Sequence, residues 1–183
     1  MNEKIKYLLY GSNLWYLGEG MLGPFLAVFT EQIGGDILEI SWAWSIYLLV
    51  SGVLTILLGK ISDRINKEKM MILGYAINAF FTFAFILVDA PFKLFIVQAG
   101  LGLASALAAP TWNALYAKYE DKGKDGMEWG LADGEAMIVT GIAILIGGII
   151  VSSFNFTALF VVMGVVQVVA TVYQAGILRN KKH

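Results

Sequence analysis

Long apolar segments separated by short polar loops fill this chain of 183 residues. A helix that crosses a membrane needs about 20 mostly apolar residues, at a rise of about 1.5 Å each. Each such segment must be helical, because unpaired backbone groups in hydrocarbon cost several kcal/mol and the alternation typical of a barrel strand is lacking. The pattern predicts an all-α polytopic membrane protein, a single bundle over residues 1–183. Its six predicted spans are residues 7–30, 40–59, 70–88, 94–117, 129–152 and 156–178.

The two halves of the chain share a feature that suggests an internal repeat. Gly23-Pro24 lies late in the first predicted span, and Ala109-Pro110 lies late in the fourth. Two three-helix inverted repeats would place proline at equivalent positions. Prolines also kink membrane helices without any repeat, so this pattern alone leaves both explanations open.

Basic residues in the loops predict the orientation across the membrane. They cluster before the first span, in the second-to-third and fourth-to-fifth loops, and at the C-terminus, while the other loops are acidic with Lys93 as their only base. Because basic loops stay on the cytoplasmic side, we expect both termini in the cytoplasm. The first span is too long for a signal peptide and is predicted to be retained. We expect an inner or plasma membrane of the bacterial type.

Composition agrees with a membrane protein and excludes other classes of function. Hydrophobic residues make up 58% and charged residues 15% of the chain, against roughly 45–50% and about 25% in soluble domains. The net charge of −1 and the scattered basic residues argue against nucleic acid as a partner. The chain has no cysteine, and its only histidine, His183, is the last residue. Without a phosphate-binding loop or clustered metal ligands, we expect no enzyme activity, no metal and no cofactor.

A charged motif follows the second span. It reads Gly59-x-x-x-Asp63-Arg64-x-Asn66-Lys67-x-Lys69 and resembles the loop 2–3 signature of the major facilitator superfamily. Gly59 permits close helix approach, Asp63 can interact with the N-terminal dipole of a partner helix, and Asn66 can take the left-handed turn that glycine usually supplies. The sequence departs from the signature at Asn66 and at Glu68, where a base is expected. The alternative interpretation is a solvated charge run that only orients the chain.

The resemblance to this family extends over the chain. Residues 18–26 resemble first helices of its drug-exporter and sugar-exporter branches, and residues 134–148 resemble its glycine-rich fifth helix. The Gly-Pro pair linked to antiport is missing, since Ala143-Ile144 stands there, and the fourth span has no arginine. The resemblance implies that spans one, two, four and five of a six-helix unit face a substrate between two bundles. A homodimer with a two-fold axis along the membrane normal would rebuild that cleft.

Polar and aromatic residues within the spans are the candidate transport residues. Glu19 lies near the middle of the first span, where an acid costs roughly 2.5–3.5 kcal/mol. We predict that Glu19 couples transport to protons, with Asp133 as a second candidate; a glutamate that only hydrogen-bonds within the bundle is the alternative. An aromatic cavity around an acid suits an amphipathic or cationic organic solute, although aromatic residues also serve as packing or interface anchors. The predicted cavity residues are Ser12, Asn13, Tyr16, Glu19, Trp44, Tyr47, Gln98, Trp112 and Asn113.

Three functions are open at this stage. We favour a homodimeric secondary transporter of a small organic solute that works by alternating access, in which Asp63 approaches residues 127–130 of the second copy. The second is a non-transporting membrane subunit or assembly factor, because the missing proline and arginine leave the coupling signatures incomplete. The third is one half of a larger transporter, against which Met1 and the basic tail after Leu178 suggest natural ends.

Overall fold

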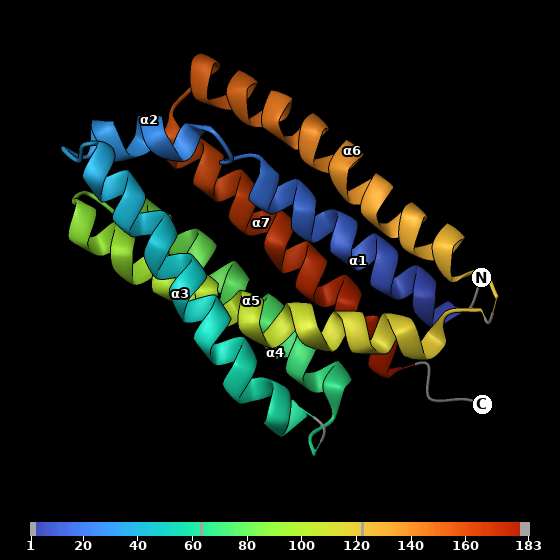
Figure 1. Cartoon of the computed structure of the whole chain (residues 1–183). Helices are drawn as coiled ribbons and strands as arrows, with labels where there is room; N and C mark the ends of the chain where they lie inside the picture. The colour runs from blue at the N-terminus through green and yellow to red at the C-terminus, as the bar shows by residue number, and fades with distance from the viewer. Residues whose placement is uncertain (1–2, 63, 122, 180–183) are drawn as a thin grey trace.

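The computed structural model describes residues 3–62, 64–121 and 123–179, and it is built of helices that run side by side (Figure 1). Within this described part, five helices are long and apolar enough to cross a membrane, namely α3, α4 with η1, α5, α6, and α7 with η2. The all-helical class is confirmed, and five predicted spans each match a helix. The elements are α1 (Glu3–Gly20), α2 (Phe25–Gln32), α3 (Ile37–Ser62), α4 (Lys67–Ala84), η1 (Phe85–Leu87), α5 (Pro91–Tyr119), α6 (Asp125–Ser153), α7 (Phe156–Ala175) and η2 (Gly176–Leu178).

The first predicted span, residues 7–30, is interrupted. A turn over residues 21–24 separates α1 from α2. Pro24 precedes α2 and has no backbone N–H, so it cannot continue the hydrogen-bond ladder of α1. The turn also packs on α6, where a side chain at Gly147 would overlap the Met21 carbonyl. Hydropathy does not reveal this break because the sequence on both sides of it is apolar.

The proline in α5 has a different effect. α5 continues through Pro110 without a break. The next residue, Thr111, is fully buried and donates its hydroxyl to the Leu107 carbonyl at 2.6 Å, which adds a hydrogen bond where the proline removes one. The two prolines that suggested a repeat therefore shape their helices differently.

The long helices pack around an arc in the order α3, α5, α4, α7, α1, α6. α5 lies between α3 and α4, α1 lies between α6 and α7, and α4 packs on α7 in the middle (Figure 1). Exchanging α1 with α5, α3 with α6 and α4 with α7 gives the same order from the other end. Two three-helix inverted repeats would have this property, and the repeat stays a prediction.

Burial is concentrated in the middle of the arc. In α5, 56% of the most apolar stretch lies buried, against 6% in α3 and 11% in α6. α3 and α6 are therefore the edges of the bundle. We call the face between these two edges, which α1 and α5 line, the open face.

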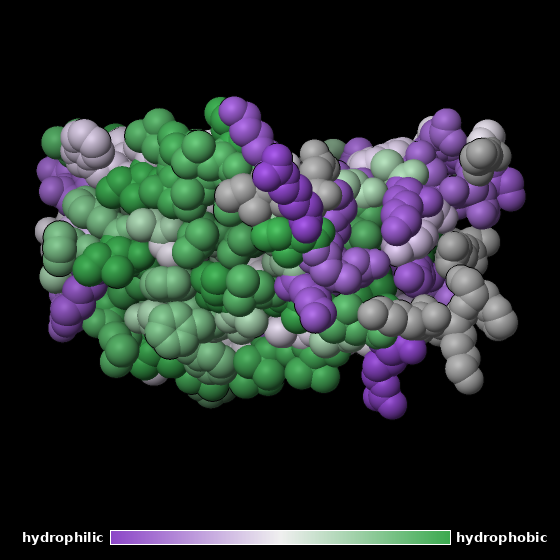
Figure 2. All heavy atoms as spheres, turned by 90° about the horizontal axis from the view of Figure 1, so that it is seen from below, coloured by the Kyte–Doolittle hydropathy of each residue, from purple (hydrophilic) through white to green (hydrophobic). Residues whose placement is uncertain are grey.

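The start of α1 and the end of η2 lie at the same end of the bundle as the start of α6 (Figure 1). We call this the terminal end, and the opposite one the distal end. Figure 2 shows that apolar side chains cover much of the helices on the face in view, while hydrophilic side chains gather at the terminal end. This arrangement agrees with the topology that the basic loops predict, and the cytoplasmic location of the termini stays a prediction.

Candidate functional site

Two adjoining cavities lie on the open face. The first, nearer the terminal end, has a volume of about 270 Å³, and the second has about 350 Å³. Tyr16 of α1 and Tyr47 of α3 line both cavities, so the two form one continuous site. The first cavity is lined by Ser12, Trp15, Tyr16, Tyr47, Tyr75, Ser105, Ala108, Ala109, Trp112, Asn113, Trp129, Ala132 and Asp133. The second is lined by Tyr16, Glu19, Gly20, Leu22, Gly23, Leu26, Trp44, Tyr47, Phe85, Gln98, Leu101, Thr140 and Met163.

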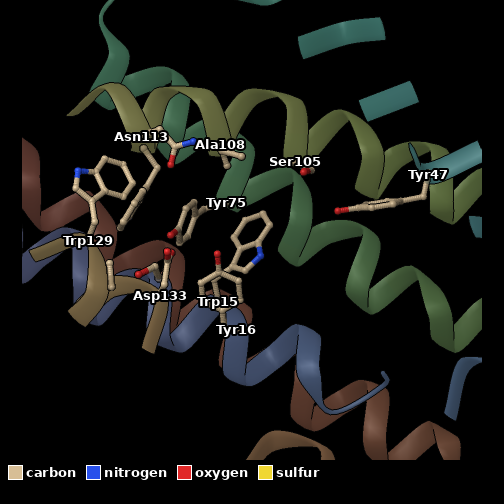
Figure 3. A pocket seen from close by; sticks show the side chains of 13 residues that line it. Trp15, Tyr16, Tyr47, Tyr75, Ser105, Ala108, Asn113, Trp129 and Asp133 are labelled. Carbon is tan, nitrogen blue, oxygen red and sulfur yellow. The ribbon is translucent and has the colours of Figure 1, made fainter. Parts of the chain in front are cut away.

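Aromatic rings surround the acid of the first cavity. Figure 3 shows Asp133 among Trp129, Tyr75, Trp15 and Tyr16, with Tyr47 pointing its hydroxyl toward Ser105 farther along. The rings of Trp15 and Tyr75 pack on each other, with centroids 4.6 Å apart. Ring faces attract cations and Asp133 supplies a negative charge, so the arrangement can hold an organic cation of modest size.

Glu19 lies where the second cavity meets the interior of the bundle. Asn78 of α4 donates through Nδ2 to Glu19 Oε1 at 2.9 Å, and Nε2 of Gln167 in α7 lies 3.4 Å from the same oxygen. Both amide side chains are buried. Glu19 therefore belongs to a buried hydrogen-bond network and also lines a cavity, and its role in proton coupling stays a prediction.

Asn13 lies apart from the other predicted cavity residues. Its Nδ2 donates to Glu135 Oε2 at 2.7 Å, in the seam between α1 and α6. It borders a separate apolar groove there and does not line either cavity of the open face. The reason is its angle around α1, since at 100° per residue Asn13 lies about 120° from Glu19. The prediction that placed Asn13 with Ser12 and Tyr16 does not match this geometry.

Several lining residues were absent from the prediction. Ser105 follows Gln98 and precedes Trp112 at the same seven-residue step on α5, a signal that the sequence does contain. Tyr75 comes from α4, a helix that the family resemblance places at the periphery, and nothing in the sequence turns it toward the open face. Trp129, at the start of the fifth predicted span, has the position of an interfacial anchor.

The loop motif lies at the terminal end, where Arg64, Lys67 and Lys69 follow α3. The predicted left-handed turn at Asn66 is wrong, because its φ is −65° and its ψ 110°. Its Oδ1 instead accepts a hydrogen bond from the Lys69 N–H at 2.8 Å and caps α4. Among the described residues, a Cβ at Gly59 would meet nothing within 4 Å. Asp63, the acid of the motif, lies outside the described residues.

Glu68, the departure from the motif, has a structural role. It accepts a hydrogen bond from the Tyr119 hydroxyl at 3.1 Å, and that hydroxyl accepts one from Lys4 Nζ at 3.0 Å. The Lys4 ammonium also lies 4.6 Å from the centre of the Tyr119 ring. These contacts tie α4, α5 and α1 together at the terminal end.

Comparison with known proteins identifies the family to which this chain is similar. The family model for the Major Facilitator Superfamily matches residues 8–183. The multidrug resistance protein MdtG of Salmonella typhimurium is 25% identical over 167 residues, which cover 89% of this chain and 41% of that protein. The uncharacterized MFS-type transporter MJ1560 of Methanocaldococcus jannaschii is 24% identical over 156 residues, which cover 85% and 40%. The chain thus spans about two fifths of the length of these curated relatives.

Proposed function

Because this chain belongs to the Major Facilitator Superfamily, we propose that it is half of a secondary transporter that moves a small organic solute by alternating access. The other half is a second copy of the same chain, related by a two-fold axis along the membrane normal. The two open faces then enclose the solute between them. The same two bundles, rocking about the axis, expose the solute to one side of the membrane at a time.

The observation that carries this proposal is the polar lining of the open face. Tyr16 is 41% exposed, and Asn113 and Asp133 are exposed too. Asp133 lies eight residues into α6, roughly 12 Å along the helix. An acid or an amide that faces lipid costs several kcal/mol, whereas exposed leucine costs nothing there. A second bundle over this face would enclose these groups in a hydrated cleft and remove that cost.

The two edge helices supply the contact between copies. A Cβ at Gly52 of α3, or at Gly134 or Gly141 of α6, would meet nothing within 4 Å among the residues that the structure describes. Such positions give a smooth surface on which another helix can pack closely. Gly148 differs, since a Cβ there would meet the Phe25 ring at 3.1 Å. The distal part of α6 therefore packs on its own chain around Gly148, and in the rest of the helix the face that carries Gly134 and Gly141 is the one we assign to the partner.

The solute we propose is an amphipathic or cationic organic molecule. Asp133 and the surrounding rings would bind it by charge and cation–π contact. The name of the relative MdtG, a multidrug resistance protein, supports an organic solute of this kind. Glu19 is the proposed proton-coupling group, because it lines the adjoining cavity and its Oε1 lies within reach of two buried amide donors.

Native mass spectrometry from lipid nanodiscs tests the assembly. We expect a mass of two chains of 20.0 kDa each, and purified protein should bind tetraphenylphosphonium, an aromatic organic cation. Asp133→Asn should weaken that binding about tenfold through loss of the charge. A single-chain mass at every protein concentration contradicts the homodimer. A stable complex with a different chain would favour a heterologous half or a subunit role.

Reconstituted vesicles test the coupling. Glu19→Gln keeps the shape of the side chain but cannot ionise, so we expect it to abolish proton-driven movement of tetraphenylphosphonium while binding persists. The matched control is Glu135→Gln, because Glu135 also accepts a hydrogen bond from an asparagine but lines neither cavity of the open face. Proton-driven movement that survives Glu19→Gln unchanged would contradict the role of Glu19.

A further inference from the structure

Two glutamines of α7 pack against two glycines of α1 in successive layers. Gln167 fills the space beside Gly18, and Gln174 fills the space beside Gly11, because a Cβ at either glycine would overlap the glutamine side chain. Both glutamines are fully buried. The two layers are seven residues apart on each helix, which is about two turns. The second layer therefore repeats the first, one step closer to the terminal end.

The two layers differ in their hydrogen bonds. Gln167 donates through Nε2 to the Trp15 carbonyl at 3.0 Å, three residues before Gly18. Gln174, the equivalent residue, has no hydrogen-bond partner at either amide atom among the described residues. In Gln174 the amide oxygen lies beside Gly11, whereas in Gln167 the amide nitrogen lies beside Gly18, so Gln174 must turn its amide over to donate as Gln167 does. A buried amide without partners is costly, so this position needs an explanation.

The spacing of the two layers points to the acceptor that Gln174 would use. The same seven-residue step leads from the Trp15 carbonyl to the Leu8 carbonyl, which accepts a hydrogen bond from Trp112 Nε1 at 3.1 Å. A carbonyl has two lone pairs, and within α1 one of them takes the N–H four residues further on. A single lone pair of Leu8 is left for a side chain. On this spacing, Gln174 would need the same lone pair that Trp112 takes.

We propose that Trp112 and Gln174 alternate as the hydrogen-bond donor to the Leu8 carbonyl. When the Trp112 N–H leaves this carbonyl, Gln174 donates to it, and in this way Gln174 is a positioning residue for Trp112. Trp112 lines the first cavity, so a solute bound there draws its ring and its N–H away from α1. Gln174 then donates to the carbonyl, which keeps it paired while Trp112 serves the solute. The exchange links occupancy of the cavity to the seam between α1 and α7, where Gln167 and Glu19 also meet. The part played by the solute rests on the proposed function, and the exchange itself does not.

A double-mutant cycle on thermal stability tests the exchange without any ligand. Trp112→Phe removes the N–H donor, and Gln174→Met removes the replacement donor while keeping an unbranched side chain. In the wild-type background, Gln174 takes the freed carbonyl. In the Gln174→Met background nothing does, so Trp112→Phe should lower the Tm by about 2–4 °C more, the shift expected for one hydrogen bond in a chain of this size.

Gln167→Met is the matched control, because the acceptor of Gln167 is the Trp15 carbonyl and Trp112 does not compete for it. Trp112→Phe should lower the Tm equally with and without Gln167→Met. An equal drop with and without Gln174→Met, or a smaller drop with it, would overturn the exchange.

Binding of tetraphenylphosphonium tests the link to the cavity. Gln174→Met should leave the Tm of the ligand-free protein unchanged or raised, because it replaces an unpartnered buried amide with an apolar chain. It should weaken binding about fivefold, since the bound state then leaves the Leu8 carbonyl unpaired. Unchanged affinity would overturn the link. If the wild type binds no tetraphenylphosphonium, the proposed solute class fails, and the stability cycle still decides the exchange.

Discussion

The middle of the bundle and its two edges are both apolar, yet their surroundings differ. α6 contains the most apolar stretch among the five spans and is 11% buried there, whereas the stretch in α5 is less apolar and 56% buried. Small residues explain the burial of α5, since Gly100, Gly102, Ala104, Ala106 and Ala108 are all buried. In a membrane, apolar sequence reports contact with lipid, and small residues report contact between helices. α5 and α6 each contain nine Gly and Ala residues, so the comparison teaches that the two helices differ in whether the chain's own helices cover their small residues, and not in side-chain size.

The sharpest test of this difference is a glycine in the middle. A Cβ at Gly74 of α4 would lie 2.8 Å from the Ala104 carbonyl oxygen and 2.8 Å from the Ala108 nitrogen. Both are backbone atoms of α5 that cannot move aside, so Gly74→Val should cost about 3 kcal/mol of unfolding free energy. The control is Gly52→Val at the edge, where a Cβ would meet nothing within 4 Å in the described part of the chain. Equal losses in denaturant unfolding would remove the distinction between middle and edge.

A substitution at the edge should act on assembly and not on the fold. Gly141→Leu fills the smooth surface of α6, so we expect the dissociation constant of the homodimer to rise about tenfold, or about 1.4 kcal/mol, at unchanged Tm of the dissociated chain. Dilution in nanodiscs followed by mass analysis measures this. Phe80→Leu is the control, because Phe80 is exposed on α4 and lies outside the open face. If both variants dissociate alike, α6 is not the contact.

The caps of the two middle helices should contribute more modestly. Asn66 caps α4, and Asn155 caps α7 by accepting a hydrogen bond from the Ala158 N–H at 2.9 Å. We expect Asn66→Ala and Asn155→Ala each to lower the unfolding free energy by about 1 kcal/mol. Serine at either position should restore most of the lost unfolding free energy, because its hydroxyl can accept the same hydrogen bond. Stability unaffected by the alanines would mean that packing alone defines where these helices begin.

The smallest effect concerns an ion pair at the distal end. Lys93 Nζ donates to Asp89 Oδ2 at 2.7 Å, and this contact lowers the pKa of Asp89 below its usual 3.8. A pKa lowered by folding stabilises the protein above the ordinary value, and that contribution is lost as the pH falls through the folded value. Asp89→Asn should therefore lower the Tm by less than about 1 °C at neutral pH and not at all in stronger acid. If the Tm of Asp89→Asn differs from that of the wild type more in acid than at neutral pH, the predicted pH dependence is contradicted.

The sequence predicted the helices better than it predicted their interruptions. Apolar length located α3 to α7 to within a few residues, because a span must satisfy its backbone internally. The same reasoning failed at residues 21–24, where a proline and contact with Gly147 decide the break, while Pro110 leaves α5 continuous. The break depends on contact with α6, which no local pattern encodes, whereas α5 gains its replacing hydrogen bond from the adjacent Thr111.

The candidate site was predictable where one helical face decides it. Glu19 and Tyr16 share a face of α1, and Gln98 and Trp112 share one on α5, so periodicity brings these four residues to the cavities. Asn13 lies about 120° from Glu19 around α1, so its side chain reaches Glu135 of α6 instead. Partners across helices, such as the two amides near Glu19, depend on packing that only the folded chain shows.

The open face has an evolutionary consequence under the proposed pairing. One gene encodes both walls of the cleft, so every mutation changes two contacts at once. A substitution that costs about 1.4 kcal/mol at one wall costs about 2.8 across both, a hundredfold change in affinity where a fused transporter would see tenfold. Specificity in such a chain shifts in large steps, and neither wall can specialise alone. Gene duplication would release that constraint.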